Sequence, residues 1–184
     1  MSEVVIVRHA DTDWTASGQH TGRTDLPLNE AGLADATTLP PRLAPWSFAV
    51  VWCSPLARAV QTCEIAGFGA QARERQDIQE WDYGAYEGLT TEQIRELQPG
   101  WNLWRDGCPR GEDAAAVGAR ADEVLASVPA EGDVLVFSHG HFLRVLTARW
   151  LGLEPQRGAV FMLAPGAIGV LGHDHEQRVL RALG

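Results

Sequence analysis

The chain has 184 residues, of which 45% are hydrophobic and 21% charged, a composition typical of a soluble globular protein. This length predicts one domain, residues 1–184, with a core of its own. The formal net charge of −9, without any basic block, disfavours a nucleic-acid or membrane-surface binder. No apolar run approaches the ~20 residues that cross a bilayer, and Met1–Ala10 lacks the pattern of a signal peptide.

The three cysteines, Cys53, Cys63 and Cys108, are odd in number and lack a CxxC spacing. We interpret them as small buried apolar residues rather than as a disulfide framework or a zinc site, which fits a reducing cytoplasm. The chain contains no lysine. Any anion site must therefore use arginine, histidine and backbone N–H groups.

The first third of the chain predicts two strands and two helices. Val4–Val7 is an apolar, β-branched run typical of a strand buried on both faces. A long polar loop, residues 10–28, separates it from a helix that Asn29 opens and Pro40-Pro41 ends. Phe48–Cys53 predicts a second buried strand. Ser54 is then the expected N-cap, with Pro55 at the first helical position, of a helix that ends near Ala66.

The remaining elements follow the same alternation of strand and helix. Strands are expected at Ala72–Ile78, Asp133–Phe137, Ala159–Leu163, Ala167–Leu171 and Arg178–Leu183, and helices at Thr91–Leu97, Glu112–Ser127 and Phe142–Leu151. Because strands and helices alternate without an internal repeat, we predict an α/β fold with a mainly parallel sheet.

Charged and imidazole side chains follow three of these strands. Arg8 and His9 come directly after the first strand, Arg58 lies in the first turn of the helix after the second, and His139 follows Asp133–Phe137. Taken singly, each is explained nearly as well by a surface cation or a satisfied core histidine. If the strands are neighbours, however, their carboxyl ends meet at one edge of the sheet, near helix N-termini that favour anions. Together these side chains predict a pocket for a tetrahedral oxyanion.

Five segments carry a resemblance to a known family, in the order RHADTDW, TGRTDLPLNEAG, CSPLARAVQT, EWDYGAYEG and SHGHFLRVL. They resemble the motifs of the histidine phosphatase superfamily, from Val4 to about Leu171. The similarity is greatest to the branch of acid phosphatases and sedoheptulose-bisphosphatases. The resemblance implies the phosphoglycerate mutase-like fold, a three-layer α/β/α arrangement.

The resemblance also implies a set of catalytic residues. His9 would be the nucleophile that forms a phosphohistidine, Arg8, Arg58 and His139 would hold the phosphoryl oxygens, and Glu80 would be the proton donor. Phosphoryl transfer is catalysed mainly by positioning and charge stabilisation. Two guanidinium groups and a second imidazole can supply both, so we expect neither a metal nor another cofactor.

Further residues are expected to bind the substrate by the same resemblance, namely Thr15, Thr21, Gly22, Arg23 and Gly140. Two departures from the family pattern are Ala10 in place of glycine after the nucleophile and Thr15 in place of asparagine. Arg23 has two interpretations: contact with a second phosphate or a sugar hydroxyl, or an ion pair with Asp25 or Glu30. Glu87, the alternative to Glu80, is expected to form structural hydrogen bonds.

The segment 98–112 lies where the family varies its lid, so it is a candidate for setting specificity. Within it, Trp101 and Trp104 are at helical spacing, which is more typical of core or subunit-interface residues than of a substrate platform. His139 and His141 form an HxH pair, but the Asp-His continuation of metallo-hydrolases is missing, so no metal site is expected.

Three functions compete. The first is a phosphatase that hydrolyses a small phosphate ester, with sugar phosphates favoured by the resemblance. The second is a cofactor-dependent phosphoglycerate mutase, but mutases of this family typically have a basic C-terminal tail, whereas Glu176–Gly184 carries only Arg178 and Arg181. The third is a binding protein on a degenerate scaffold, which should have lost one of the catalytic residues, and none is lost. The oligomeric state is left open, with a homodimer as one alternative.

Overall fold

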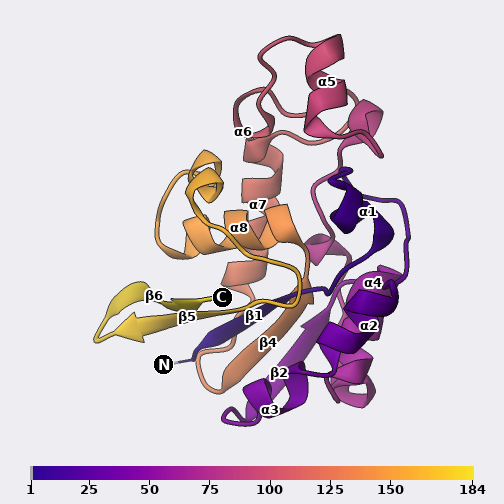
Figure 1. The fold of residues 1–184 in the computed structure, drawn as a ribbon. Coiled ribbons are helices and arrows are strands. Elements are labelled where there is room, and N and C mark those ends of the chain that lie inside the picture. Colours follow the sequence, from indigo (N-terminus) through magenta and orange to yellow (C-terminus); the bar gives the residue numbers. More distant parts are fainter. Residues whose placement is uncertain (1) are drawn as a thin grey trace.

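The computed structural model describes residues 2–184. These residues contain one six-stranded sheet (Figure 1). The strands are β1 (Val4–Arg8), β2 (Phe48–Cys53), β3 (Ala72–Glu74), β4 (Asp133–Ser138), β5 (Ile168–Asp174) and β6 (Gln177–Leu183). Their order is β3-β2-β4-β1-β5-β6. The first four strands in this order pair in parallel, and β5 and β6 join as antiparallel strands. The predicted α/β fold with a mainly parallel sheet is confirmed.

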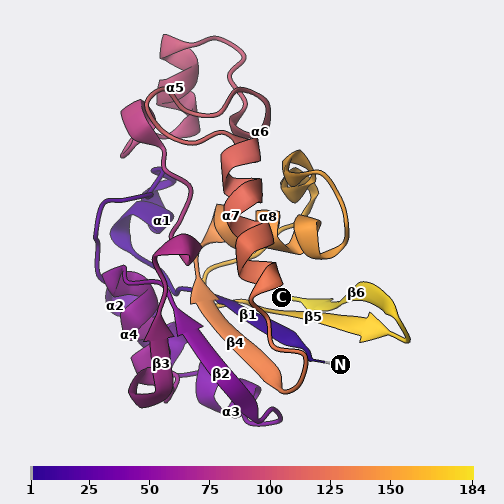
Figure 2. The same ribbon diagram turned by 180° about the vertical axis from the view of Figure 1, so that it is seen from behind.

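Helices cover both faces of the sheet (Figures 1 and 2). The helices are α1 (Asp13–Ser17), α2 (Glu30–Ala36), α3 (Leu39–Leu43), α4 (Ala57–Ile65), α5 (Thr91–Leu97), α6 (Leu103–Asp106), α7 (Ala114–Ala126) and α8 (Gly140–Trp150). On one face lie α2 and α4, and on the other α7 and α8, whereas α5 and α6 lie beyond the end of α7. No helix in residues 2–184 is long and apolar enough to cross a membrane.

The apolar strands separate two hydrophobic cores. Val4 and Ile6 of β1 pack with α7 and α8, while Val5 and Val7 pack with residues of α2, α3 and α4. Successive side chains of a strand point to opposite faces, so a strand with a core on each side must be apolar at every position. This explains why β1 is an unbroken apolar run.

Two prolines begin a helix rather than end one, which corrects the expected helix end. The helix that Asn29 caps ends at Ala36, and Pro40 and Pro41 lie in the first turn of α3. Proline lacks a backbone N–H, but the first N–H groups of a helix have no partner within the helix. Pro40-Pro41 therefore fits a helix start as well as a helix stop.

The helix after β2 begins at Ala57, not at Pro55, and Ser54 is not its N-cap. The N-cap is Leu56, which makes no side-chain hydrogen bond. The N–H of Ala57 instead donates to Asp25 Oδ1 at 2.6 Å. A carboxylate from a distant loop thus takes the capping role, and the Ser54 hydroxyl is free for another partner.

Two predicted strands were wrong in part or in whole. Only Ala72–Glu74 of the segment 72–78 pairs in the sheet, and Gln76–Ile78 forms a 3-10 turn. The expected strand at residues 159–163 does not form, because Pro155–Val160 is a 3-10 segment that packs on α8. Ala159, Val160 and Met162 are exposed, and only Leu163 of this run is buried, so its apolar composition does not mark a buried strand. Helix α8 begins at Gly140, two residues before its predicted start. A further 3-10 turn lies at Gly69–Gln71 and another at Gly84–Tyr86.

Candidate active site

The ends of three parallel strands meet at one edge of the sheet. In the register of β1 and β4, Arg8 lies opposite Ser138, and the N–H of His9 donates to the Ser138 carbonyl at 3.0 Å. The N–H of Ser54, just after β2, donates to the Phe137 carbonyl at 3.0 Å. The structure therefore brings together the strand ends that carry the predicted site residues.

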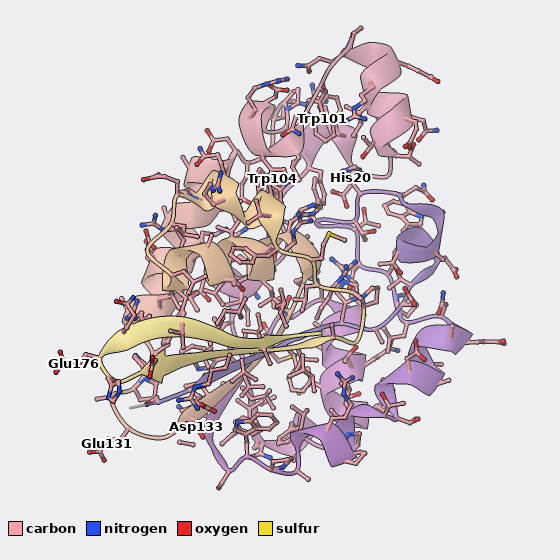
Figure 3. All side chains as sticks on the ribbon, turned by 60° about the vertical axis from the view of Figure 1, so that its left-hand side comes forward. His20, Trp101, Trp104, Glu131, Asp133 and Glu176 are labelled. Carbon is pink, nitrogen blue, oxygen red and sulfur yellow. The ribbon has the colours of Figure 1, made fainter. Side chains whose placement is uncertain are left out.

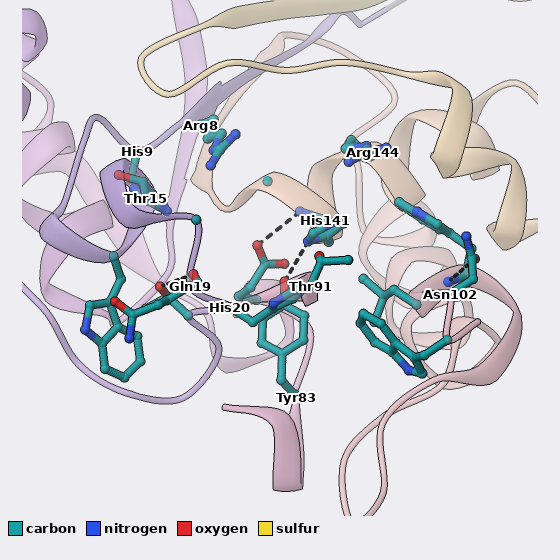
Figure 4. A pocket seen from close by; sticks show the side chains of 18 of the residues that line it. Arg8, His9, Thr15, Gln19, His20, Tyr83, Thr91, Asn102, His141 and Arg144 are labelled. Atoms are coloured by element: carbon teal, nitrogen blue, oxygen red, sulfur yellow. Dashed lines mark hydrogen bonds between the residues drawn. The ribbon is translucent and has the colours of Figure 1, made fainter. Parts of the chain in front are cut away.

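A cavity of about 350 Å³ opens at this edge (Figure 4). The residues that line it include Arg8, His9, Thr15, His20, Thr21, Glu80, Tyr83, Trp101, Trp104, Gly140, His141 and Arg144. They come from the loops after β1 and β3, from the start of α8 and from the segment around α6. The cavity thus combines the predicted strand-end residues with a wall built by the middle of the chain.

His9 lies on the cavity wall with one ring nitrogen occupied. Its Nδ1 lies 2.7 Å from the carbonyl oxygen of Ala10. Because a carbonyl can only accept, Nδ1 carries the proton and the lone pair of the neutral ring is at Nε2. Burial, together with the positive charges of Arg58 and Arg8, holds the pKa of His9 well below its usual value. His9 is therefore a neutral imidazole with a free Nε2 near pH 7.

Arg58 and His139 lie close to His9 and are fully buried. Among residues 2–184, neither is one of the residues that line the cavity. The terminal nitrogens of Arg58 donate to three backbone carbonyls, those of Thr21, Gly22 and Thr24. The ring of His139 lies 5.2 Å from that of His9, centroid to centroid. Burial, followed by the charge of Arg58, holds the pKa of His139 well below its usual value.

Three buried nitrogen atoms around His9 have no hydrogen-bond partner among residues 2–184. They are Arg8 Nε, Arg58 Nε and His139 Nδ1. Buried polar groups in proteins are nearly always paired, because an unpaired donor costs about 1–3 kcal/mol. Three of them beside one neutral imidazole form a set of donors suited to the oxygens of an anion.

Glu80 lies beneath the first turn of α8. Its Oε1 accepts from the N–H groups of Trp81 and Phe142, each at 2.8 Å, and its Oε2 accepts from the N–H of His141 at 3.0 Å. An acidic group is favourable at a helix N-terminus, where N–H groups have no partner in the helix. With a single bond, Oε2 retains the capacity to hold or receive a proton.

Other contacts fix the segment that carries Glu80. The hydroxyl of Ser138 donates to the Ile78 carbonyl at 2.6 Å, and Arg120 donates to the carbonyls of Asp77 and Gln79. The end of β4 and helix α7 thus hold this loop from two sides. The site carboxylate is therefore placed by rigid elements although it lies in a loop.

Three of the five predicted substrate-binding residues line the cavity, namely Thr15, Thr21 and Gly140. Thr15 Oγ1 donates to the carboxylate of Asp11, and its side chain forms a capping box with Thr12 at the start of α1. Gly140 lies so close to Arg8 that a Cβ atom would meet the guanidinium carbon at 3.1 Å.

Gly22 and Arg23 are not among the described residues that line the cavity. The N–H of Gly22 donates to Glu87 Oε1 at 2.8 Å, so this group is already satisfied, and the structural role expected for Glu87 is confirmed. Of the two interpretations of Arg23, the ion pair with Asp25 or Glu30 is wrong, because Arg23 pairs with Asp82, with 3.7 Å between Nε and Oδ2.

Several cavity residues were not singled out from the sequence. Tyr83 and Arg144 lie inside the quoted motifs and His20 directly precedes one, but nothing in their local pattern separates them from loop or helix residues. The sequence pattern marks His141 only as half of an HxH metal pair. In the structure the two histidines have separate partners, because His139 contacts Ser54 and His141 contacts Tyr83. The segment 98–112 borders the cavity through Trp101, Asn102, Leu103 and Trp104.

Comparison with known proteins agrees with this geometry. An acid phosphatase of Mycobacterium tuberculosis is 39% identical over 98% of this chain and 91% of its own length. A sedoheptulose 1,7-bisphosphatase of Saccharomyces cerevisiae is 35% identical over 83% of this chain and 69% of its own. The solved structure of an open reading frame of Mycobacterium tuberculosis superposes with a TM-score of 0.94 at 39% identity and covers 100% of this chain and 97% of that one.

Residues 4–184 of this chain match the family model of the histidine phosphatase superfamily, branch 1. The matched region contains every strand whose end supplies a residue to the site. The strand-end imidazoles, the buried arginines and the similarity over nearly the whole chain agree, and this chain belongs to the histidine phosphatase superfamily, branch 1.

Proposed function

We propose that the protein is a metal-independent phosphatase that hydrolyses phosphate esters of small metabolites, sugar phosphates in particular, through a phosphohistidine at His9. The observation that carries this proposal is the free Nε2 of His9 beside three unpaired donors, Arg8 Nε, Arg58 Nε and His139 Nδ1. The acid phosphatase and sedoheptulose 1,7-bisphosphatase activities named for the two relatives support it.

In the first step His9 Nε2 attacks the phosphorus atom and the ester P–O bond breaks. The three donors hold the non-bridging oxygens, whose charge must be stabilised as the phosphoryl group moves. Glu80 Oε2 gives its proton to the leaving oxygen, so that an alcohol departs instead of an alkoxide. His9 is left bonded to phosphorus, and Glu80 is left as a carboxylate.

In the second step water attacks the same phosphorus atom and the P–N bond breaks. Glu80 takes a proton from this water as general base, and inorganic phosphate and free His9 are the products. Glu80 thereby returns to its starting state. The cavity that admits the ester also gives water a path to His9, which favours hydrolysis over return of the phosphoryl group to a second substrate.

The proposal extends to substrate class and location. A net charge of −9 disfavours a polyanion such as nucleic acid, and a cavity of about 350 Å³ suits a metabolite. We place the protein in the cytoplasm, since its cysteines are free and buried, as is usual in a reducing compartment. A homodimer stays a prediction.

Phosphate release tests the proposal. The purified protein is incubated with sugar phosphates, 3-phosphoglycerate and p-nitrophenyl phosphate, with and without a chelator. We expect release that resists the chelator, disappears in His9→Ala and persists in the control His175→Ala, whose side chain is 96% exposed. Acid-labile, alkali-stable labelling of the protein by ³²P substrate identifies the phosphohistidine.

Isomerisation of 3-phosphoglycerate to 2-phosphoglycerate without phosphate release would replace the phosphatase by the mutase alternative. Absence of both reactions with every substrate would contradict an enzymatic function of this site.

A further inference from the structure

Two histidines that the proposed chemistry does not use face each other on the cavity wall. The rings of His20 and His141 are parallel within 4°, with centroids 6.3 Å apart. They come from the loop after α1 and from the first turn of α8, and both line the cavity (Figure 4).

His20 presents an acceptor to the cavity. Its Nδ1 lies 2.9 Å from the carbonyl oxygen of Leu89, and because a carbonyl cannot donate, this nitrogen carries the proton. Burial lowers the pKa of His20, so the ring is neutral near pH 7. Its Nε2 therefore has a free lone pair and no hydrogen.

His141 presents a donor. Its Nδ1 lies 2.6 Å from the hydroxyl oxygen of Tyr83, and this is the only hydrogen bond of that hydroxyl among residues 2–184. If Tyr83 accepted, its own proton would be left without a partner, so Tyr83 donates to Nδ1. Burial holds the pKa of Tyr83 well above its usual value and that of His141 well below, which keeps both groups neutral. The proton of the His141 ring is then on Nε2.

We infer that His20 and His141 determine specificity by binding a hydroxyl group of the leaving group, with His20 Nε2 as acceptor and His141 Nε2–H as donor. This inference rests on the proposed phosphatase function. A hydroxyl both donates and accepts, so it satisfies both nitrogens. A carboxylate or a second phosphate only accepts and would place its lone pairs against that of His20.

The position of the pair fits a leaving group. The backbone N–H of His141 donates to Glu80 Oε2, the oxygen proposed to protonate the leaving oxygen. The histidine pair therefore lies next to the point where the ester bond breaks. A hydroxyl that contacts it belongs to a carbon close to the ester oxygen.

Aromatic rings complete this wall. The ring of Trp101 lies 5.6 Å from His20 and that of Trp104 lies 5.4 Å from His141, centroid to centroid. Figure 3 shows His20, Trp101 and Trp104 gathered in one part of the molecule. Aromatic faces suit the C–H surface of a polyol or sugar. Two arginines line the cavity here, and both donate to backbone carbonyls, Arg144 through Nε and Nη2 and Arg95 through Nε. The combination points to a hydroxylated carbon skeleton as the leaving group.

A matched pair of substrates tests the inference, namely glycerol 3-phosphate and propyl phosphate, which differ only in hydroxyl groups. We expect kcat/KM of the wild type to favour glycerol 3-phosphate by about tenfold or more, the value of one or two hydrogen bonds. The ratio of the two kcat/KM values should fall to near one in His20→Phe and in His141→Leu. His141→Gln, which keeps an N–H donor, should retain part of it. The control His175→Phe should change neither value.

Two outcomes would overturn the inference. One is a wild type without preference between the two substrates. The other is an unchanged ratio in the variants, with both values falling together, which would mean a structural role. If a variant does not fold, Tyr83→Phe replaces it, because loss of the Tyr83 donor should lower the same ratio. Hydrolysis of p-nitrophenyl phosphate, abolished by His9→Ala, verifies the phosphatase function separately. Its absence in the wild type would overturn the proposed function itself.

Discussion

Ser54 Oγ lies 2.7 Å from His139 Nε2, and this hydrogen bond joins the end of β2 to the end of β4. Both residues are fully buried. The N–H of Leu56 points at the same hydroxyl oxygen, 3.5 Å away, so the oxygen accepts from the backbone and its proton is available for His139. Ser54 thereby directs the single proton of neutral His139 to Nδ1, the nitrogen without a partner in the described chain.

Replacement of Ser54 by alanine should therefore impair catalysis. Without the hydroxyl, His139 is free to carry its proton on Nε2, and Nδ1 then offers a lone pair to the phosphoryl oxygens. We expect kcat to fall about tenfold, the value of one hydrogen bond, and Ser54→Thr to restore most of it. Ser47→Ala, at the opposite end of β2 and exposed, is the control. An unchanged kcat in Ser54→Ala would show that Ser54 does not position His139.

The titration of His9 should reveal the charges around it. Burial, then Arg58 and Arg8, lower its pKa, so its titration midpoint should lie below the usual value of about 6.5. Removal of a positive charge in Arg8→Gln should move the midpoint to higher pH. The exposed Arg73→Gln should leave it in place. The ¹³C shift of the His9 ring followed by NMR measures this, and a wild-type midpoint above 6.5 would contradict it.

Stability should decrease in mild acid. The pKa values of His9, His20, His139 and His141 are all lowered in the fold. Above a pH of about 6.5 these histidines are neutral in both states, but below it the unfolded chain binds protons first. The free energy of unfolding should thus fall as the pH decreases below about 6.5, by up to about 1.4 kcal/mol per pH unit for each histidine.

Urea unfolding at a series of pH values from 7.5 to 5.5 measures this dependence. His20→Asn should make the dependence on pH less steep, because it removes one of the four groups. His175→Asn, at the exposed hairpin turn, should leave it unchanged. A free energy of unfolding that is constant over this range would count against burial of neutral histidines.

The sheet edge that carries the proposed site could be predicted, because the sequence signals for it are local. An apolar run such as Val4–Val7 predicts a buried strand, and the polar residues that follow it must then lie at the strand end. Parallel pairing of β1, β4 and β2 brings these ends together without further information from the sequence. For that reason Arg8, His9 and His139 were found, and their convergence is seen in the structure.

Contacts between distant segments could not be predicted in this way. Asp25 caps α4 through Ala57, and Glu87 binds the N–H of Gly22, 65 residues away. Each depends on where a loop passes, which no local pattern records. His141 is a similar case, because it precedes two core residues of α8 and only the Tyr83 contact marks it as different.

Gly140→Ala should reduce activity without unfolding the protein. A Cβ at position 140 would lie 3.1 Å from Arg8 Cζ and 3.2 Å from Arg8 Nε, so the guanidinium must shift. Its Nη1 is held by the Leu163 carbonyl at 2.7 Å, which limits how it can move. The displaced Nε would no longer point at the phosphoryl group, and we expect kcat/KM to fall at least about tenfold, the value of one charge-assisted hydrogen bond.

The thermal midpoint of Gly140→Ala distinguishes a local displacement of Arg8 from a general loss of stability. Alanine is favoured over glycine by about 1 kcal/mol in a helix interior, and part of this gain applies to Gly140, which begins α8 without a positive φ. This gain should offset much of the cost of moving Arg8, so the thermal midpoint should change little while kcat/KM decreases. If kcat/KM of Gly140→Ala equals that of the wild type, the position of Arg8 Nε is not what the reaction requires. A large fall in the thermal midpoint would instead show that the Arg8 side chain cannot shift to accommodate the Cβ. The close packing of α8 on β1 would then be required for the stability of the fold.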